Sequence, residues 1–279
     1  MPLDLRKVKC GGAENTVSGS AADGGVSADE LFAAWVIGPN QGGVVGGGGG
    51  RIPAKSKRAG VQAVLFDLDG VLVDTARFHH LAWKRLADEL GVAFNEKISD
   101  GFRGVGRMEC LEKLLGKFSK GLAAEEKRVL ADRKNGYYLE QVMTLRPGDL
   151  AAGARHLAMM LRAAPPGGVR MGLVSASKNA RLVLELLGIT DWFDAIVDGT
   201  DAVRSKPDPQ GFLLCAKKLR VEAEQCVVVE DAEAGIRAGQ AAGMVCVGIG
   251  ASAVGADCVV KSVGELTVER IDSIWANSE

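Results

Sequence analysis

The sequence has no long apolar run and no excess of charge of one sign. None of its apolar runs approaches the roughly 18 residues that a membrane-spanning helix needs, so we expect no membrane partner. The 34 Lys and Arg residues nearly balance the 35 Asp and Glu residues, for a net charge of −1. Charge therefore gives no reason to expect nucleic acid as a partner.

The sequence also lacks a C-x-x-C pair among its six cysteines. Cys226 and Cys246 lie in apolar, strand-like runs, where buried and reduced thiols are expected. The N-terminus has no apolar core for secretion, and its acidic residues argue against a transit peptide. These features favour a reducing compartment, and we expect a cytoplasmic protein. The 279 residues are enough for one large domain or two smaller ones.

Residues 1–60 differ in composition from the rest of the chain. They contain "QGGVVGGGGG" and then the basic "RIPAKSKRAG", and such a segment buries too little apolar surface to offset its ordering entropy. We expect a disordered, linker-like extension, in which only "SADELFAAWVIG" favours a short helix. The glycine run has no strand before it and Pro53 after it, which argues against a dinucleotide-binding loop.

From Val61 onward, apolar strand candidates alternate with helical stretches. This alternation is typical of βαβ units, so the predicted fold is α/β, with a Rossmann-like, doubly wound parallel sheet. The strand candidates are residues 61–66, 169–175, 193–197, 225–230, 244–250 and 257–260, and the helical stretches are 179–187, 210–219, 232–242 and 265–275.

One interval, residues 76–146, contains helical patterns but no convincing strand. A helical insert of this length after the first strand predicts a separate cap domain, 76–146, on a core formed by 61–75 and 147–279. The segments "VDTA" and "LRPGD" would be its hinges.

Polar residues follow three of the apolar runs at the point where each strand should end. In an open α/β sheet the carboxyl ends of the strands form the ligand site, so these residues are expected to converge. They are Asp67 and Asp69 after the first run, Ser175 and Ser177 after "MGLV", and Glu230 and Asp231 after "CVVV". Asp67, Glu230 and Asp231 would offer hard oxygen ligands that suit Mg²⁺.

Such a site has the groups that phosphoryl transfer needs. A carboxylate attacks phosphorus only when the charges on both partners are screened, and Mg²⁺ with Lys206 of "SKPDP" would screen them. Asp69, two residues after Asp67, could donate a proton to the leaving oxygen and later accept one.

Four motifs in this order resemble the haloacid dehalogenase-like phosphotransferases: "DLDGVLVDT", "SASKN", "SKPDP" and "EDAEAGIRAG". The resemblance covers Val61 to the C-terminus. Within that superfamily, "DTARFHHLAWKRLADELG", "FRGVGRMECLEKLL", "RKNGYY" and "VSASKN" resemble the β-phosphoglucomutases.

The resemblance implies a role for each candidate residue. Asp67 would be the nucleophile that becomes aspartyl-phosphate, Asp69 the general acid and base, and Mg²⁺ would be held by Asp67, the backbone carbonyl of Asp69, Glu230 and Asp231. The implied substrate-binding residues are Ser175 and Lys206 for the transferring phosphoryl group; Arg107, Ser177, Lys178 and Asn179, with Ala176 in the same loop, for the second phosphate; His79 for closure; Trp83, Gly104 and Val105 for the sugar pocket; and Thr75 in the hinge.

The sequence departs from the family pattern in two places. Ala151, Ala152 and Gly153 stand where Pro-Gly is usual, which predicts a looser hinge. Arg103 stands where Lys is common, which keeps the charge but not the geometry.

Structural alternatives exist for these residues. Asp67 and Asp69 could form a turn, Asp231 or Thr75 could cap a helix, and Lys206 could lie on the surface. His79 could simply be packed or solvated, Arg107 could be a solvated residue at a helix start, and Trp83 is better explained as core.

The expected function is a Mg²⁺-dependent phosphomutase that interconverts β-D-glucose 1-phosphate and D-glucose 6-phosphate through a bisphosphate. A phosphatase of sugar phosphates, or a sugar-phosphate-binding regulator without turnover, would be the alternatives. The partner in each case is a small sugar phosphate, and we expect a monomer.

Overall fold

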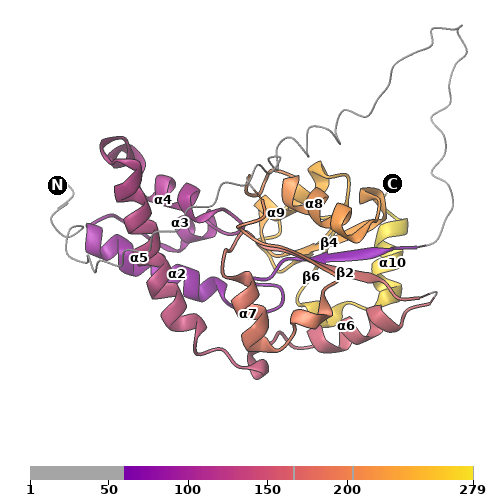
Figure 1. Cartoon of the computed structure of the whole chain (residues 1–279). Helices are drawn as coiled ribbons and strands as arrows, with labels where there is room; N and C mark the ends of the chain where they lie inside the picture. The colour runs from indigo at the N-terminus through magenta and orange to yellow at the C-terminus, as the bar shows by residue number, and fades with distance from the viewer. Residues whose placement is uncertain (1–59, 166, 203, 279) are drawn as a thin grey trace, which may run out of the picture. The chain divides into compact units, whose positions relative to one another are not determined.

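A computed structural model describes residues 60–165, 167–202 and 204–278. The predictions for residues 1–59 lie outside the described residues. Six parallel strands form one sheet in the order β3-β2-β1-β4-β5-β6 (Figure 1). The strands are β1 (Ala63–Phe66), β2 (Arg170–Val174), β3 (Ala195–Val197), β4 (Cys226–Glu230), β5 (Val245–Ile249) and β6 (Cys258–Val260). Each lies within a predicted run, and the doubly wound α/β class is confirmed.

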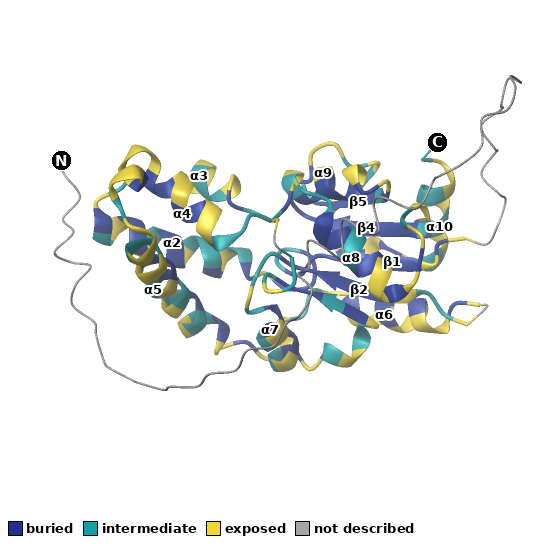
Figure 2. Cartoon of the chain, turned by 45° about the horizontal axis from the view of Figure 1, so that its top comes forward, coloured by how far each residue is buried: buried dark blue, intermediate teal, exposed yellow. Residues whose placement is uncertain are grey.

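Helices cover both faces of the sheet because its strands are apolar on both sides. Val64 and Phe66 belong to an apolar cluster with α6 (Ala154–Ala163), α7 (Ala180–Leu187) and α10 (Val268–Ala276). Ala63 and Leu65 point to the opposite face, where α8 (Gln210–Leu219) and α9 (Glu233–Ala241) pack. Figure 2 shows the strands as buried and the outer faces of the helices as exposed.

Helix α6 was absent from the sequence prediction. Its buried residues Ala154, Leu157, Ala158 and Leu161 have the i, i+3, i+4, i+7 spacing of an amphipathic helix, so the signal was present. Short 3₁₀ helices occur at Gly116–Gly121, Pro147–Asp149, Thr190–Trp192, Ala223–Gln225 and Val263–Glu265.

Residues 76–146, called the helical insert below, contain no strand, as predicted. Trp83, Leu111 and Leu130 belong to an apolar cluster confined to the insert, whereas Phe78 and Tyr138 belong to the cluster beside the sheet. The insert therefore has a core of its own and is also anchored to the sheet; its status as a separate domain stays a prediction. Its helices are α2 (Ala76–Leu90), α3 (Glu96–Asp100), α4 (Arg107–Leu115) and α5 (Ala124–Val142). The side chain of Asn95 caps the first turn of α3.

The predicted buried thiols are confirmed. Cys226 and Cys246 are fully buried and not in disulfides, and burial raises the pKa of both thiols to about 12. Among the described helices, none combines the length and the apolar character required to cross a bilayer.

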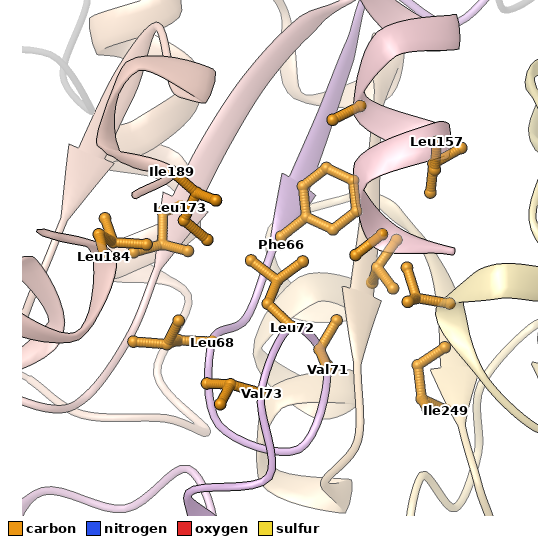
Figure 3. Close-up of a cluster of buried hydrophobic side chains, with 14 of the residues drawn as sticks. Phe66, Leu68, Val71, Leu72, Val73, Leu157, Leu173, Leu184, Ile189 and Ile249 are labelled. Atoms are coloured by element: carbon orange, nitrogen blue, oxygen red, sulfur yellow. The ribbon is translucent and has the colours of Figure 1, made fainter. Parts of the chain in front are cut away.

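The loop after β1 is held by its own apolar residues. Leu68, Leu72 and Val73 pack into the cluster beneath the sheet, together with Phe66 and Leu173 (Figure 3). The turn closes through a hydrogen bond from Gly70 N to Val73 O at 2.8 Å, and Gly70 has φ +86°. The apolar residues of "DLDGVLVD" thus fix the loop, and its acidic residues remain at the carboxyl edge of the sheet.

Close packing on the face of the sheet that α8 covers predicts opposite effects for two glycine substitutions. A Cβ at Gly172 in β2 would collide with Cys215 Sγ and Leu65 Cδ2, whereas a Cβ at exposed Gly136 in α5 would have no neighbour within 4 Å. We expect Gly172→Ala to lower the free energy of unfolding by about 1–3 kcal/mol. Gly136→Ala should raise it by about 0.5–1 kcal/mol, because alanine favours the helix. Urea denaturation measures both, and equal effects of the two substitutions would contradict this packing.

Candidate active site

Three carboxylates converge where the strand order reverses. Asp67 follows β1, Glu230 ends the neighbouring strand β4, and Asp231 comes next; Asp67 N donates to Val229 O at 2.9 Å. One carboxylate oxygen from each residue lies within 4.8 Å of the other two. All three residues are buried, Glu230 completely. The predicted convergence of distant segments is therefore present.

Lys206 joins the ends of three strands. Its Nζ donates to Asp67 Oδ1 at 2.5 Å, to Glu230 Oε1 at 2.6 Å and to the backbone carbonyl of Val174, the last residue of β2, at 3.1 Å. Burial alone would lower the pKa of Lys206, but Asp67 and Glu230 raise it above its usual value. Lys206 is only 5% exposed, so the surface interpretation is wrong.

Glycines leave the space that the acidic side chains occupy. A Cβ at Gly235 would overlap the Glu230 carboxylate, and a Cβ at Gly70 would overlap that of Asp231. Glu230 Oε2 also accepts a hydrogen bond from Ala232 N at 2.8 Å. Gly70 of "DLDGVLVDT" thus leaves the space that Asp231 occupies, and Gly235 of "EDAEAGIRAG" leaves the space that Glu230 occupies.

Asp231 does not cap the following helix. The N-cap of α9 is Ala232, and Asp231 Oδ2 instead accepts a hydrogen bond from Arg103 Nη1 at 2.8 Å. The capping alternative is thus wrong. Arg103 contacts the cluster although it was not among the candidate site residues predicted from the sequence.

The carboxylate cluster fits a divalent cation. Burial raises the pKa of Asp67 well above its usual value, although the charge of Lys206 opposes this shift. Burial and the charge of Glu230 raise the pKa of Asp231 to about 7. Such a cluster needs positive charge to stay ionised. Its oxygens are the donors that Mg²⁺ prefers.

Asp69 lies at the edge of the cluster and is partly exposed. Its Oδ1 accepts a hydrogen bond from the Thr75 hydroxyl, and His79 Nε2 lies 3.8 Å away. Thr75 is fully buried at the start of α2, but its side chain does not cap the helix. Burial raises the pKa of Asp69, and the Thr75 hydrogen bond partly opposes this.

His79 is partly exposed and contacts two buried residues, Lys134 and Tyr138, that the sequence analysis missed. Its Nδ1 lies 2.8 Å from Lys134 Nζ, and its ring stacks on Tyr138 at 4.0 Å. Burial, then the charges of Lys134 and Arg107, hold the pKa of His79 well below its usual value, so the ring is neutral. Lys134 and Tyr138 lie one turn apart on α5, in "RKNGYY"; this i, i+4 pairing was the available signal.

The predicted phosphate-binding loop after β2 is built from two short turns. Ser175 Oγ accepts from Ser177 N at 3.1 Å, and Ser177 Oγ accepts from Asn179 N at 3.2 Å. The Asn179 side chain donates to Asn135 of the insert at 2.8 Å, and Lys178 is exposed.

Most of the predicted residues line one cleft of about 1660 Å³. Arg107 is the first residue of α4, and its Nη1 lies 3.6 Å from Asp132 Oδ1. Trp83 is buried in the core of the insert and also lines the cleft. Thr75 and Glu230 are fully buried and are not part of the cleft lining. The lining includes Asp67, Asp69, His79, Trp83, Gly104, Val105, Arg107, Ser175, Ala176, Ser177, Lys178, Asn179, Lys206 and Asp231, together with Arg103, Lys134 and Asn135.

The burial of Lys134 predicts a stability that depends on pH. Burial lowers the pKa of this amine from its usual 10.5 to about 7, so between these values the unfolded chain binds more protons and stability rises with pH. Lys134→Met should raise the free energy of unfolding by a few kcal/mol near pH 7, and the gain should shrink toward pH 10.5.

Urea denaturation at several pH values between 7 and 10 measures this effect. Lys97→Met, at an exposed lysine of α3, is the control and should show no such trend. A gain from Lys134→Met that stays constant across the range would contradict a depressed pKa.

Comparisons with known proteins show which family the chain belongs to. A family model described as haloacid dehalogenase-like hydrolase matches residues 61–243. The β-phosphoglucomutase of Bacillus subtilis is 40% identical over 219 residues, which cover 77% of this chain and 96% of that protein. The fructose-1-phosphate phosphatase of Escherichia coli is 30% identical over 188 residues, which cover 65% of this chain and 92% of that protein.

A solved structure of a related enzyme has a similar fold. The crystal structure of β-phosphoglucomutase from Clostridium difficile has 37% sequence identity and a TM-score of 0.73, and the match covers 77% of this chain and 97% of that one. The family model, the relatives and the fold thus confirm the resemblance inferred from the four motifs. The chain is an enzyme of the haloacid dehalogenase-like hydrolase family.

Proposed function

We propose that the protein is a Mg²⁺-dependent phosphomutase that interconverts β-D-glucose 1-phosphate and D-glucose 6-phosphate through an aspartyl-phosphate and a bisphosphate intermediate. One observation carries the proposal: the cleft contains the buried carboxylate of Asp67 paired with Lys206, and it is also lined by a separate set of cationic and amide side chains, Arg107, Lys178 and Asn179. A mutase must hold both phosphates of a bisphosphate, whereas a phosphatase needs to hold only one. The similarity to β-phosphoglucomutases supports the same choice.

Asp67 is the proposed nucleophile, and its buried position suits attack on a phosphorus atom. Lys206 already contacts Asp67, and Ser175 follows the neighbouring strand, so both lie where they can bind the oxygens of the transferring phosphoryl group. Asp67, Glu230 and Asp231 would hold Mg²⁺, with the backbone carbonyl of Asp69 as the family resemblance implies. When bound there, Mg²⁺ would supply charge neutralisation for the transferring group.

Asp69 is the proposed general acid and base. Burial raises its pKa, which brings a carboxyl group closer to the range in which it can donate a proton at neutral pH. Thr75 holds the carboxylate through its hydroxyl, and neutral His79 lies beside it without adding a positive charge. Asp69 would protonate the leaving oxygen and then accept a proton from the hydroxyl that attacks the aspartyl-phosphate.

The helical insert contributes one residue to the proposed second phosphate anchor and would exclude water from the cleft. Arg107 comes from the insert and Lys178 and Asn179 from the core, so one phosphate would be held by both parts. The hydrogen bonds Asn179–Asn135, at 2.8 Å, and Ser205–Glu109, at 2.9 Å, already join them. Exclusion of water would protect the aspartyl-phosphate from hydrolysis. The cap-domain division, the monomeric state and the cytoplasmic compartment stay predictions.

The alternative is a phosphatase of sugar phosphates with the same nucleophile. It is favoured by the phosphatases among the relatives, such as the fructose-1-phosphate phosphatase at 30% identity. The reaction products decide between the two activities, because only the mutase returns the phosphate to the sugar.

The second anchor predicts a change in products when Arg107 is lost. Purified protein is given Mg²⁺, β-glucose 1-phosphate and a trace of glucose 1,6-bisphosphate, and glucose 6-phosphate and free phosphate are followed separately. Wild type should form mainly glucose 6-phosphate. Arg107→Met should raise KM about tenfold or more, because a charged hydrogen bond is lost, and should increase the share of free phosphate.

Arg85→Met is the matched control, since Arg85 is half exposed, pairs with Glu140 at 2.9 Å and lies outside the cleft lining. Its products should match those of wild type. Stoichiometric release of phosphate by wild type, without glucose 6-phosphate, would replace the mutase proposal with the phosphatase.

A further inference from the structure

One ion pair links the helical insert directly to the carboxylate cluster. Arg103 lies in the loop 101–106 between α3 and α4, and its Nη1 is 2.8 Å from Asp231 Oδ2, a residue 128 positions away in the sequence. The Arg103 side chain is 35% exposed and that of Asp231 is 8% exposed. Arg103 Nε also lies 3.3 Å from Asp100 Oδ1 within the insert. A cation of the insert thus contacts a carboxylate that the proposed function assigns to the metal.

The whole loop lies against the core at this point. A Cβ at Gly104 would lie 3.4 Å from Lys206 Cδ, and a Cβ at Gly106 would lie 3.3 Å from Ser205 Cβ. Gly104 has φ +71°, a conformation in which a side chain is strained. Ser205 also donates to Glu109, in the first turn of α4. The Arg103–Asp231 pair is therefore one part of a docking contact between loop 101–106 and the segments that carry Lys206 and Asp231.

Every carboxylate of the cluster already has a protein cation. Lys206 contacts Asp67 and Glu230, and Arg103 contacts Asp231. A divalent cation bound to the same carboxylates would be repelled by both side chains. Lys206 is buried in the core, whereas Arg103 belongs to the insert and is partly exposed, so only Arg103 can withdraw when its loop moves.

We propose that Arg103 is a positioning residue that couples docking of loop 101–106 to occupancy of the metal site, because its guanidinium and a divalent cation compete for the Asp231 carboxylate. This inference rests on the metal site of the proposed function. Coupling between two sites is reciprocal, so Mg²⁺ weakens docking of the loop by the same factor by which docking weakens binding of Mg²⁺. Partial exposure of Arg103 reduces the effect through solvent screening but does not change its sign.

Calorimetric titration with Mg²⁺, without substrate, tests the competition. Arg103→Met should bind Mg²⁺ about fivefold more tightly than wild type, or more, which is the lower end of typical coupling. Arg103→Lys keeps the charge and should stay closer to wild type. Arg237→Met removes the same charge from α9, where Arg237 is 67% exposed and pairs with Glu233 at 2.8 Å, and its Mg²⁺ affinity should stay within about twofold of wild type.

Hydrogen exchange tests the reciprocal half of the coupling. In wild type, Mg²⁺ should speed exchange of the amides in residues 101–106; in Arg103→Met these amides should exchange fast with or without Mg²⁺. An affinity of Arg103→Met that is unchanged, weaker or equal to that of Arg237→Met would overturn the coupling while leaving the metal site intact. A wild type that binds no Mg²⁺ would overturn the metal site, and the coupling with it.

Discussion

The contact of one buried ammonium group with three strand ends organises this structure. Lys206 Nζ donates to Asp67, which follows β1, to Glu230, which ends β4, and to the carbonyl of Val174, which ends β2. Without this cation, two buried carboxylates would repel each other, and at least one would be protonated. Parallel strands bring their carboxyl ends to one edge, and the reversal of strand order beside β1 leaves the space in which the groups meet. The fold thus brings the acids to one edge of the sheet, and Lys206 offsets part of the charge that gathers there.

Glycine and apolar residues at the same edge of the sheet hold the acidic residues in place. Leu68 and Val71–Val73 pack into the core and hold the loop that carries Asp67 and Asp69, while Gly70 leaves room for Asp231. Gly235 does the same for Glu230 from the side of α9. A rigid, closely packed support is what a site for phosphoryl transfer requires, because its catalysis depends on positioning and on charge.

The sequence predicted the structure best where a local pattern of residues marks both a strand and the polar residues that follow it. All six strands follow from apolar runs, and the acids at their ends follow from the polar residues that close those runs. Arg103, Lys134 and Tyr138 were not identified as site residues, because each acts through a partner far away in the chain or through burial that a helix pattern does not specify. Lys134 is 2% exposed although lysine is usually solvated, and only its contacts with His79 and the Trp83 ring show why. Long-range pairing of this kind follows from the fold and not from local spacing.

The central claim is that Asp67 is the side chain that receives the phosphoryl group. Mass spectrometry after borohydride treatment tests it most directly: the protein is mixed with Mg²⁺ and glucose 1,6-bisphosphate and quenched, and an acyl phosphate is reduced to the alcohol. The account predicts that Asp67, and no other residue of the peptide containing Asp67 and Asp69, is converted to homoserine. Phosphate found on Ser175, or reduction at Asp69 in place of Asp67, would contradict it.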